Sequence, residues 1–419
     1  MKRSIAGAPL RGQHIMLSGI RVLDLTCERG FLAGKILGDM GADVVKIEAP
    51  TGDAIRQRGP FLAGKEGPER SLPWLALNTS KRGITLDLDQ PDGQDVFRTL
   101  AKQADIVLES FQPGLMKDRG LGYAALVADN PKLIYCAISP FGQDGPYSHY
   151  NAHDLVIVAM SGNLQMTGDP DRPPIRCTMP TSYYHAAPEA VLGIIMALYS
   201  REDSQRGQFV DVSMQETHTS TLLCHTGNYS VDGVINHRAG YRVGPSREVW
   251  KVKDGYISYG LRGGPTRVPN LVATVEYMDE TGCAPEWLKN YNWKNYDVFS
   301  MTSEEIAPLE EAFGSFFETK TRAELFEESV KRRIMLAPCN DSAEVLAHRQ
   351  LRSRDLFVTL DYPELGASIE HPNFFAKTTG NDVRIRGKAP KLGEHTDAVL
   401  QEAGISTEKV SALRQQGVI

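Results

Sequence analysis

Residues 20–47, IRVLDLTCERGFLAGKILGDMGADVVKI, contain the pattern that decides the fold of this chain. Ile20 to Leu25 form a short β-branched run that is typical of a buried strand. Phe31 to Met40 follow with the apolar periodicity of a helix, and Ala42 to Ile47 supply a second apolar run. Strand, helix and strand in this order predict a βαβ unit.

The same alternation continues through the first half of the chain. Further strands are predicted over Ile84 to Leu88, Asp105 to Leu108, Leu133 to Ile138 and Gln208 to Ser213, and helices around Gln94 to Gln103 and over Ala187 to Leu198. Short Gly, Pro and Asp turns between such elements are typical of a mostly parallel sheet covered by helices. The expected fold class is therefore α/β, with a large Rossmann-like, doubly wound domain.

Ligands of doubly wound sheets bind at the carboxyl ends of the strands. In this sequence those ends are predicted at Thr26 to Gly30, Glu48 to Pro50, Glu109 to Phe111 and Pro140 to Gly142. Before the strand at Ile84, the residues Asn78, Lys81 and Arg82 are interpreted as a solvated basic turn.

A change of composition beyond Met214 predicts a second domain. Val249 to Leu261 has the pattern of a hairpin with Asp254-Gly255 as its two-residue turn. Ile306 to Phe317 and Arg322 to Lys331 are predicted to form amphipathic helices. These elements predict a smaller α+β domain over residues 225–335, preceded by the N-terminal part of the large domain over residues 1–224.

The overall composition argues against several classes of function. A net charge of -6 and a pI near 6.0 disfavour a nucleic-acid-binding protein. No apolar run approaches the roughly 20 residues of a membrane-spanning helix, so no membrane association is expected. The six cysteines form no CxxC pair, which is typical of reduced thiols in a cytoplasmic protein, and the dispersed histidines predict no metal site.

Eight segments, in chain order, carry a resemblance to a known family. They are GIRVLDLT (19–26), MGADVVKIEAPTGD (40–53), NTSKRGITLDLDQPDG (78–93), ADIVLESFQPG (104–114), SPFGQDGPYS (139–148), SGNLQMTGDPDRPP (161–174), RGQFVDVSMQE (206–216) and APKLGEHTDAVL (389–400). With these segments the chain resembles the class III CoA-transferase family, which also contains the α-methylacyl-CoA racemases.

The resemblance implies several properties that composition and periodicity do not show. It implies that residues 336–419 return to the large domain and that two chains form an interlocked dimer. It also implies that a coenzyme A thioester binds as a substrate, with no other cofactor.

One position departs from the family pattern. Family members carry an aspartate just before the helix that here reads Ala190 to Leu198, and this aspartate is the nucleophile of the transferases and an acid/base of the racemases. Counting back from Gly193 without a gap places Tyr183 at that position. Because a phenol has a pKa near ~10 and is a poor acyl acceptor at neutral pH, Tyr183 cannot replace the carboxylate. The resemblance therefore implies that this chain carries no catalytic residue of its own.

Three residues are the fallback candidates for catalysis. His153 and Asp154 match a pair that acts in the racemase branch, where the histidine transfers a proton beside the α-carbon. The alternative interpretation is that Asp154 caps the helix that follows and that His153 only lines a cleft. Glu189 is the other nearby carboxylate, and its alternative role is an interaction with the dipole at the start of its helix.

Six residues match positions that contact CoA or substrate in the family: Arg29, Ala49, Leu86, Ser110, Phe111 and His153. Phe111 is suited to packing beside adenine, and Arg29 to pairing with a phosphate or carboxylate. Three departures weaken the match, since Asp89, Asp118 and Ala49 stand where family members place basic residues. Carboxylates beside phosphates would repel the ligand, so the residues leave open whether a CoA site is retained.

The sequence supports three hypotheses about function. The first is a subunit of a heteromeric CoA-transferase, in which a paralogous subunit with the aspartate performs the covalent steps of CoA transfer from succinyl-CoA to a carboxylic or dicarboxylic acid. The second is a self-sufficient homodimeric transferase or isomerase that uses Asp154 and His153. The third is a regulatory protein that binds an acyl-CoA without turning it over.

Overall fold

The computed structural model describes residues 15–419, which divide into two compact units. Unit 1 contains residues 15–163, 177–230 and 349–419, and unit 2 contains residues 164–176 and 231–348. The predicted boundaries at residues 225 and 336 therefore differ from the observed ones. Residues 164–176, predicted in the large domain, belong to unit 2 because the Arg238 guanidinium donates to the Gln165 carbonyl (3.1 Å) and the Gly240 amide to the Gly168 carbonyl (3.0 Å). Residues 1–14 of the predicted large domain lie outside the described residues.

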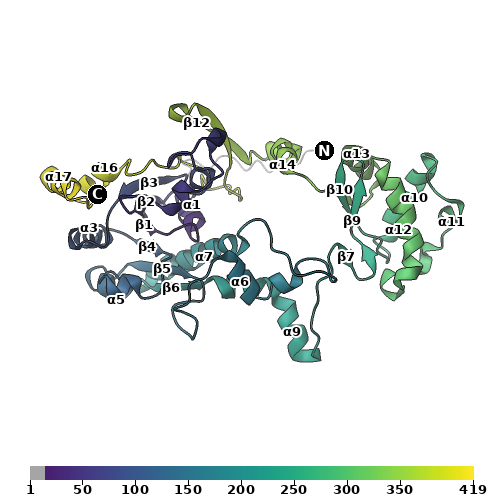
Figure 1. Cartoon of the computed structure of the whole chain (residues 1–419), viewed down its shortest axis with the longest axis horizontal. Coiled ribbons are helices and arrows are strands. Elements are labelled where there is room, and N and C mark those ends of the chain that lie inside the picture. The colour runs from purple at the N-terminus through teal and green to yellow at the C-terminus, as the bar shows by residue number, and fades with distance from the viewer. Residues whose placement is uncertain (1–14) are drawn as a thin grey trace. The chain divides into compact units, whose positions relative to one another are not determined.

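Unit 1 is built on a six-stranded sheet (Figure 1). Its strands are β1 Arg21–Leu25, β2 Asp43–Glu48, β3 Lys81–Thr85, β4 Ile106–Glu109, β5 Ile134–Ser139 and β6 Phe209–Ser213. They lie in the order β3-β2-β1-β4-β5-β6, and every neighbouring pair is parallel. This is a doubly wound order with its topological switch point between β1 and β4. The predicted α/β class with a parallel central sheet is confirmed.

Helices cover both faces of this sheet (Figure 1). The α3 face packs against α3 Pro91–Lys102, α5 Tyr123–Asp129, α16 Thr396–Glu402 and α17 Thr407–Gln415. The α7 face packs against α1 Phe31–Asp39, α6 Asp154–Met160 and α7 Thr181–Ser204. Because successive residues of a strand point to opposite faces, Val107 enters the core on the α3 face and Leu108 the core on the α7 face.

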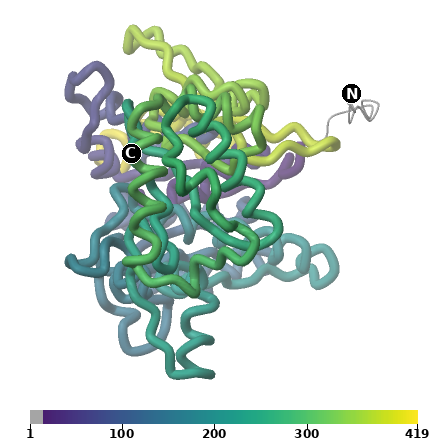
Figure 2. The backbone as a smooth tube through the Cα atoms, turned by 90° about the vertical axis from the view of Figure 1, so that its right-hand side faces the viewer, coloured from purple at the N-terminus to yellow at the C-terminus, as the bar shows by residue number. Residues whose placement is uncertain are grey.

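The last segment of the chain returns to the edge of the sheet beside β3. The His395 amide donates to the Gly83 carbonyl (2.8 Å), and the Asp87 amide donates to the Val418 carbonyl (2.7 Å). Figure 2 follows this segment, in yellow, back to the N-terminal part of unit 1. The return to the large unit that the family resemblance implies is thus present from residue 349 onward.

Shorter elements complete unit 1. They are α2 Leu72–Leu77, α4 Leu115–Asp118, α8 Met214–Thr219, α15 Arg349–Ser353 and the antiparallel hairpin of β12 Phe357–Tyr362 with β13 Ala367–Pro372. Helix α9 Leu223–Asp232 runs across the boundary between the two units.

Unit 2 has its own sheet and core. Its antiparallel sheet has the order β11-β10-β9, and its elements are β7 Arg242–Val243, β8 Ser246–Arg247, β9 Val249–Val252, β10 Gly255–Tyr259, β11 Leu336–Pro338, α10 Val268–Glu280, α11 Glu286–Lys289, α12 Ser303–Glu318, α13 Arg322–Arg332 and α14 Ser342–Ala347. The hairpin is present, but its turn residues are Lys253 and Asp254 and not the predicted Asp254-Gly255, because Gly255 already pairs with Val252. Aromatic side chains, among them Trp250, Tyr259 and Phe317, fill the core between these strands and helices.

Two elements begin earlier than the sequence predicts. Helix α7 begins at Thr181 and not at Ala187, so that Tyr183 lies inside the helix and Pro188 is accommodated within it. Strand β3 begins at Lys81 and not at Ile84. The interpretation of Lys81 as part of a solvated turn is wrong, because its side chain is fully buried in an ion pair with Asp24 (2.8 Å).

Candidate functional site

A cleft of about 240 Å³ opens at the carboxyl ends of the strands beside the switch point. Its lining residues come from the ends of β1, β2 and β4 and from the segment after β3. Three of the predicted CoA contacts, Ala49, Leu86 and Phe111, line this cleft together. Leu86 is buried, Phe111 is half-buried and Ala49 is exposed at the rim. We call this the switch-point cleft.

Arg119 supplies a cation to the switch-point cleft. Its guanidinium carbon lies 5.6 Å from the centre of the Phe111 ring, and its Nε donates to Asp89 Oδ1 (3.1 Å). We expected the Asp89 carboxylate to repel the CoA phosphates, because the sequence shows no cation paired with it. In the structure the positive charge of Arg119 offsets the negative charge of Asp89. A guanidinium beside an aromatic face is suited to a planar base and a phosphate group. Asp118, at the end of α4, is exposed and does not line the cleft.

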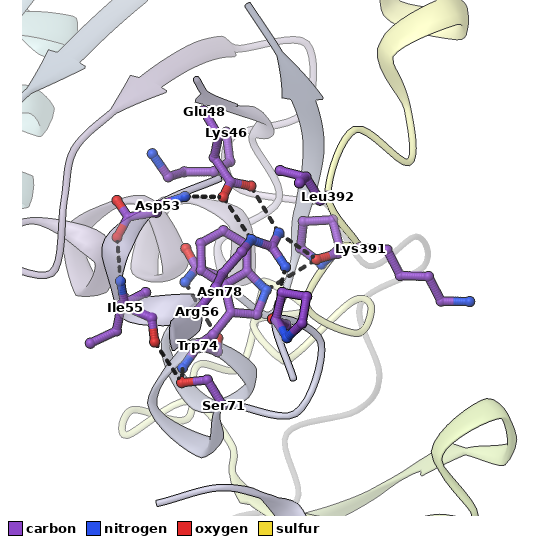
Figure 3. A network of polar contacts seen from close by, with 12 residues as sticks. Lys46, Glu48, Asp53, Ile55, Arg56, Ser71, Trp74, Asn78, Lys391 and Leu392 are labelled. Atoms are coloured by element: carbon purple, nitrogen blue, oxygen red, sulfur yellow. Dashed lines mark hydrogen bonds and ion pairs between the residues drawn. The ribbon is translucent and has the colours of Figure 1, made fainter. Parts of the chain in front are cut away.

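A buried polar network holds one wall of the switch-point cleft (Figure 3). Arg56 donates from Nε and Nη2 to the two oxygens of Glu48 (2.7 and 2.8 Å), and its guanidinium lies 3.6 Å from the Trp74 ring centre. Arg56 Nη2 and Trp74 Nε1 both donate to the Pro390 carbonyl (3.1 and 3.0 Å). Glu48 Oε2 also accepts from the Asp53 amide (3.0 Å), so the network fixes the loop that carries Ala49.

Asp53 lines the same cleft and holds the turn after this loop. Its Oδ1 accepts from the Ile55 amide (2.9 Å), and burial raises the pKa of its carboxyl.

A second buried ion pair, between Lys81 and Asp24, is hydrogen-bonded to Thr26 of the cleft lining. Lys81 Nζ donates to Asp24 Oδ2 (2.8 Å) and to Asn78 Oδ1 (2.8 Å), while Asp24 Oδ1 accepts from the Thr26 hydroxyl (2.6 Å). Burial lowers the pKa of Lys81 to about 8. Burial raises the pKa of Asp24, but the charges of Lys81 and Lys46 outweigh it and the net pKa is lowered. Lys46 Nζ donates to the Thr26 carbonyl (2.6 Å), which ties the end of β1 to β2.

Tyr183 is held at the junction of α6 and α7. Its ring is buried, with 5% of its surface exposed, and its hydroxyl accepts from the Asp154 amide (3.2 Å). Asp154 Oδ1 in turn accepts from the Ser182 amide (3.0 Å) and the Ser182 hydroxyl (2.8 Å). Burial raises the pKa of Tyr183, and the Glu28 carboxylate adds to this rise. The phenol therefore stays protonated and joins the starts of two helices.

Asp154 does not cap the helix in which it lies. The residue at the N-cap of α6 is His153, which forms no side-chain capping bond. The Asp154 carboxylate caps the first turn of α7 instead, and one of its oxygens is committed to that bond. His153 is exposed, and Glu189 is exposed on α7 well beyond the first turn, so the expected interaction of Glu189 with the dipole at the helix start is wrong.

Like His153, the predicted contacts Arg29 and Ser110 lie outside the lining of the switch-point cleft. Arg29 donates from Nη2 to Asn151 Oδ1 (2.9 Å) and to the Ala152 carbonyl (3.0 Å), which places it beside the α6–α7 junction. The Ser110 hydroxyl accepts from the Cys27 amide (2.9 Å), so this side chain joins the ends of β4 and β1. The predicted residues thus form one group in the cleft and one at the junction, while Ser110 belongs to neither.

Sequence reasoning missed Arg119, Arg56 and His218. Arg119 directly follows Asp118, which stands where family members place a basic residue. A basic residue one position later in the sequence was therefore the signal that could have identified Arg119. His218 is buried at the α6–α7 junction, where its Nδ1 lies 3.1 Å from Ser161 Oγ and its Nε2 lies 3.2 Å from Thr181 Oγ1. Burial lowers the pKa of His218, and His185 beside it adds to this effect.

Residues 15–419 contain no cluster of three His, Cys, Asp or Glu side chains arranged to hold a metal ion. Within the same residues, no helix is long and apolar enough to cross a lipid bilayer.

Comparison with known proteins agrees with the fold. Residues 17–396 match CoA-transferase family III, and the chain belongs to this family of CoA-transferases. It is 32% identical over 403 residues to succinyl-CoA:(R)-benzylsuccinate CoA-transferase subunit BbsE of Thauera aromatica, covering 96% of this chain and 98% of the relative. It is 29% identical over 416 residues to the beta subunit of succinyl-CoA–L-malate CoA-transferase of Chloroflexus aurantiacus, covering 96% and 98%.

A solved structure gives the same result for the fold. The crystal structure of a CaiB/BaiF family protein from Brucella suis superposes with a TM-score of 0.79 at 28% identity, covering 93% of this chain and 100% of that one.

Proposed function

We propose that this chain is the subunit without a nucleophile in a heteromeric class III CoA-transferase. The enzyme moves CoA from succinyl-CoA to a carboxylic or dicarboxylic acid such as benzylsuccinate, a reaction of anaerobic toluene degradation. The partner is a paralogous subunit that carries the aspartate, and the two chains form an interlocked heterodimer. The observation that carries the proposal is the phenol of Tyr183, buried and hydrogen-bonded at the position that the family resemblance assigns to the nucleophile.

The chemistry requires a carboxylate that this position lacks. The partner's aspartate attacks the thioester carbonyl, which releases the CoA thiolate and forms a mixed anhydride. The thiolate then attacks the aspartyl carbonyl, which gives an aspartyl-CoA thioester and frees succinate. The carboxylate of the acceptor acid then attacks the aspartyl-CoA thioester, which releases the CoA thiolate and forms a second mixed anhydride. The thiolate attacks the acceptor's carbonyl, which gives the new acyl-CoA and frees the aspartate. A protonated phenol with a raised pKa supplies none of these steps.

The relatives support a heteromeric assembly. Two of them are subunits by name, BbsE of Thauera aromatica and the beta subunit of the Chloroflexus aurantiacus malate enzyme, and that enzyme also has an alpha subunit that is 29% identical to this chain. The identity to BbsE favours succinyl-CoA as the donor and benzylsuccinate as the acceptor.

The switch-point cleft supports retention of a CoA site in this chain. Phe111 offers an aromatic face to adenine, and Arg119 offers a cation to a phosphate group. The subunit would then bind CoA, while the partner supplies the reacting carboxylate.

Co-expression with an aspartate-bearing class III subunit tests the proposal. The purified chain, the purified partner and the complex are each incubated with succinyl-CoA and benzylsuccinate, and enzyme-bound thioesters are trapped and located by mass spectrometry. We expect exchange only in the complex, with the adduct on the partner, and unchanged exchange when Asp154→Asn is introduced here. An adduct on Asp154 or Glu189 of the single chain would establish the self-sufficient enzyme, and CoA binding without exchange in any mixture would establish the regulatory protein.

A further inference from the structure

A second cleft, of about 530 Å³, lies on the α3 face of the sheet in unit 1. We call it the Glu109 cleft. Its strand residues, Glu109 on β4, Tyr135 on β5 and Phe209 on β6, share the face to which Val107 points. Tyr183 and the α6–α7 junction belong to the core on the opposite face. The Glu109 cleft is therefore separate from the group at that junction, and its volume suits a small organic ligand.

Aromatic side chains form one wall of the Glu109 cleft. The Tyr135 and Phe209 rings are stacked with their centres 5.6 Å apart, and the Tyr123 ring lies 5.6 Å from Phe209. Phe209 remains 39% exposed, which leaves apolar ring surface open to a ligand. Such a wall is suited to the flat face of an aromatic or otherwise planar body.

Two buried residues of the same cleft each have a polar atom without a hydrogen-bond partner in the described part of the chain. Glu109 is 5% exposed, and its Oε2 accepts from the Phe111 amide (2.6 Å), but Oε1 forms no hydrogen bond with any described residue. Tyr135 is 2% exposed, and its hydroxyl likewise has no hydrogen-bond partner within residues 15–419. Because both residues line the cleft, these two atoms are free to form hydrogen bonds with a ligand or water that enters it.

Two further polar groups of the cleft can donate hydrogen bonds. Lys117 is an exposed cation that takes part in no ion pair with the described residues, and the buried Gln143 amide nitrogen has no partner there. We propose that the Glu109 cleft binds a small organic carboxylate with an aromatic body, whose carboxylate accepts hydrogen bonds from Glu109, Tyr135 and Lys117. This proposal does not depend on the role of the chain in CoA transfer.

Glu109 donates to such a ligand only when its carboxyl is protonated. Burial raises the pKa of Glu109 to about 8, and the Asp211 carboxylate on β6 adds to the rise. The other titratable groups near it are Tyr135 and Cys136 on β5, and Lys117 and His149 in the cleft lining. No described cation forms an ion pair with Glu109, so the neutral acid is the form present at neutral pH. Affinity for a carboxylate should therefore fall as pH rises through about 8.

Isothermal titration calorimetry of the full chain with 3-phenylpropanoate tests the proposal. We expect saturable binding with a dissociation constant that rises about tenfold from pH 7 to pH 9. Glu109→Gln keeps the shape and one donor but cannot ionise, so it should bind with the same constant at both pH values. Tyr135→Phe and Lys117→Met should each weaken binding by roughly three- to tenfold at pH 7. Lys65→Met, an exposed lysine outside the cleft, is the matched control and should bind normally.

Other outcomes would overturn the proposal. Circular dichroism first confirms that each variant is folded. Absence of saturable binding up to about 10 mM ligand would refute the site. Tighter binding of benzylamine than of 3-phenylpropanoate would show that the cleft takes cations, because an ionised Glu109 attracts them and affinity then rises with pH. Wild-type affinity in both Tyr135→Phe and Lys117→Met would place the ligand elsewhere.

Discussion

Replacement of Arg56 by methionine should destabilise the wall of the switch-point cleft. The change removes both donors from Glu48, whose side chain is fully buried, and leaves its negative charge without a cation. Breaking a buried ion pair by removing one partner costs about 3–5 kcal/mol. This range includes the loss of the contact between the guanidinium and the Trp74 ring. The methionine retains much of the side-chain volume, so the expected effect is mainly electrostatic.

The double variant Glu48→Gln/Arg56→Met separates charge from packing. A neutral amide in place of the carboxylate removes the unpaired charge, and the Asp53 amide still finds an acceptor in the glutamine oxygen. We expect the double variant to recover at least half of the stability that Arg56→Met loses.

Native-state hydrogen exchange, read by mass spectrometry, is the suitable assay because the chain has two units and global unfolding is not a two-state process. Peptides covering β2 and α2 should exchange faster in Arg56→Met by the factor that corresponds to about 3–5 kcal/mol. Peptides of α12 in unit 2 should keep their wild-type rates. A loss below about 1 kcal/mol, or a double variant less stable than the single one, would refute the reasoning.

Three further predictions follow from the two groups of residues and from the Glu109 cleft. Tyr183→Phe removes the acceptor of the Asp154 amide and should lower the unfolding free energy of unit 1 by about 1 kcal/mol. The kcat of CoA exchange by the complex should stay unchanged. A loss of exchange activity would show that the phenol has a chemical role. Arg119→Ala should weaken CoA binding in calorimetry by about tenfold and Asp89→Asn should not weaken it, so equal losses would contradict the assignment of the cation. Glu109 binds its proton more tightly in the native state than in the unfolded chain, so the unfolding free energy of the wild type should fall by a few kcal/mol relative to that of Glu109→Gln as pH rises from about 4.5 to about 8. Urea denaturation with a probe in unit 1 measures this difference. A difference that does not change with pH would contradict the raised pKa of Glu109.

The parts of the fold that sequence could predict are those with a local signal. The buried strands at Val22 and Val107 form apolar runs, and Asp254-Gly255 locates the hairpin turn to within one residue of its observed position at Lys253 and Asp254. The start of β3 could not be predicted, because Lys81 looks solvated until Asp24, far away in sequence, is placed against it. The start of α7 was hidden because Thr181 to Pro188 combine aromatic, polar and proline residues that are typical of a turn.

The candidate site shows the same limit. Phe111 and Leu86 could be assigned to one cleft because each follows a strand of a predicted parallel sheet, whose ligands bind at the carboxyl ends of the strands. Their neighbour Arg119 could not, since its ion pair with Asp89 depends on how the loop after β4 folds back. The capping of α7 by Asp154 likewise joins residues that only the tertiary structure brings together.

The return of the C-terminal segment to β3 determines when unit 1 can be completed during synthesis. β3 is an edge strand, and residues near His395 and Val418 supply partners for the backbone there and just beyond it. All of unit 2 leaves the ribosome before these residues do. The β3 edge of the sheet therefore stays unpaired while more than a hundred residues are translated. Unpaired edges are sites of aggregation, and a nascent chain that stalls before residue 395 should therefore be insoluble even though every strand of its sheet has been made.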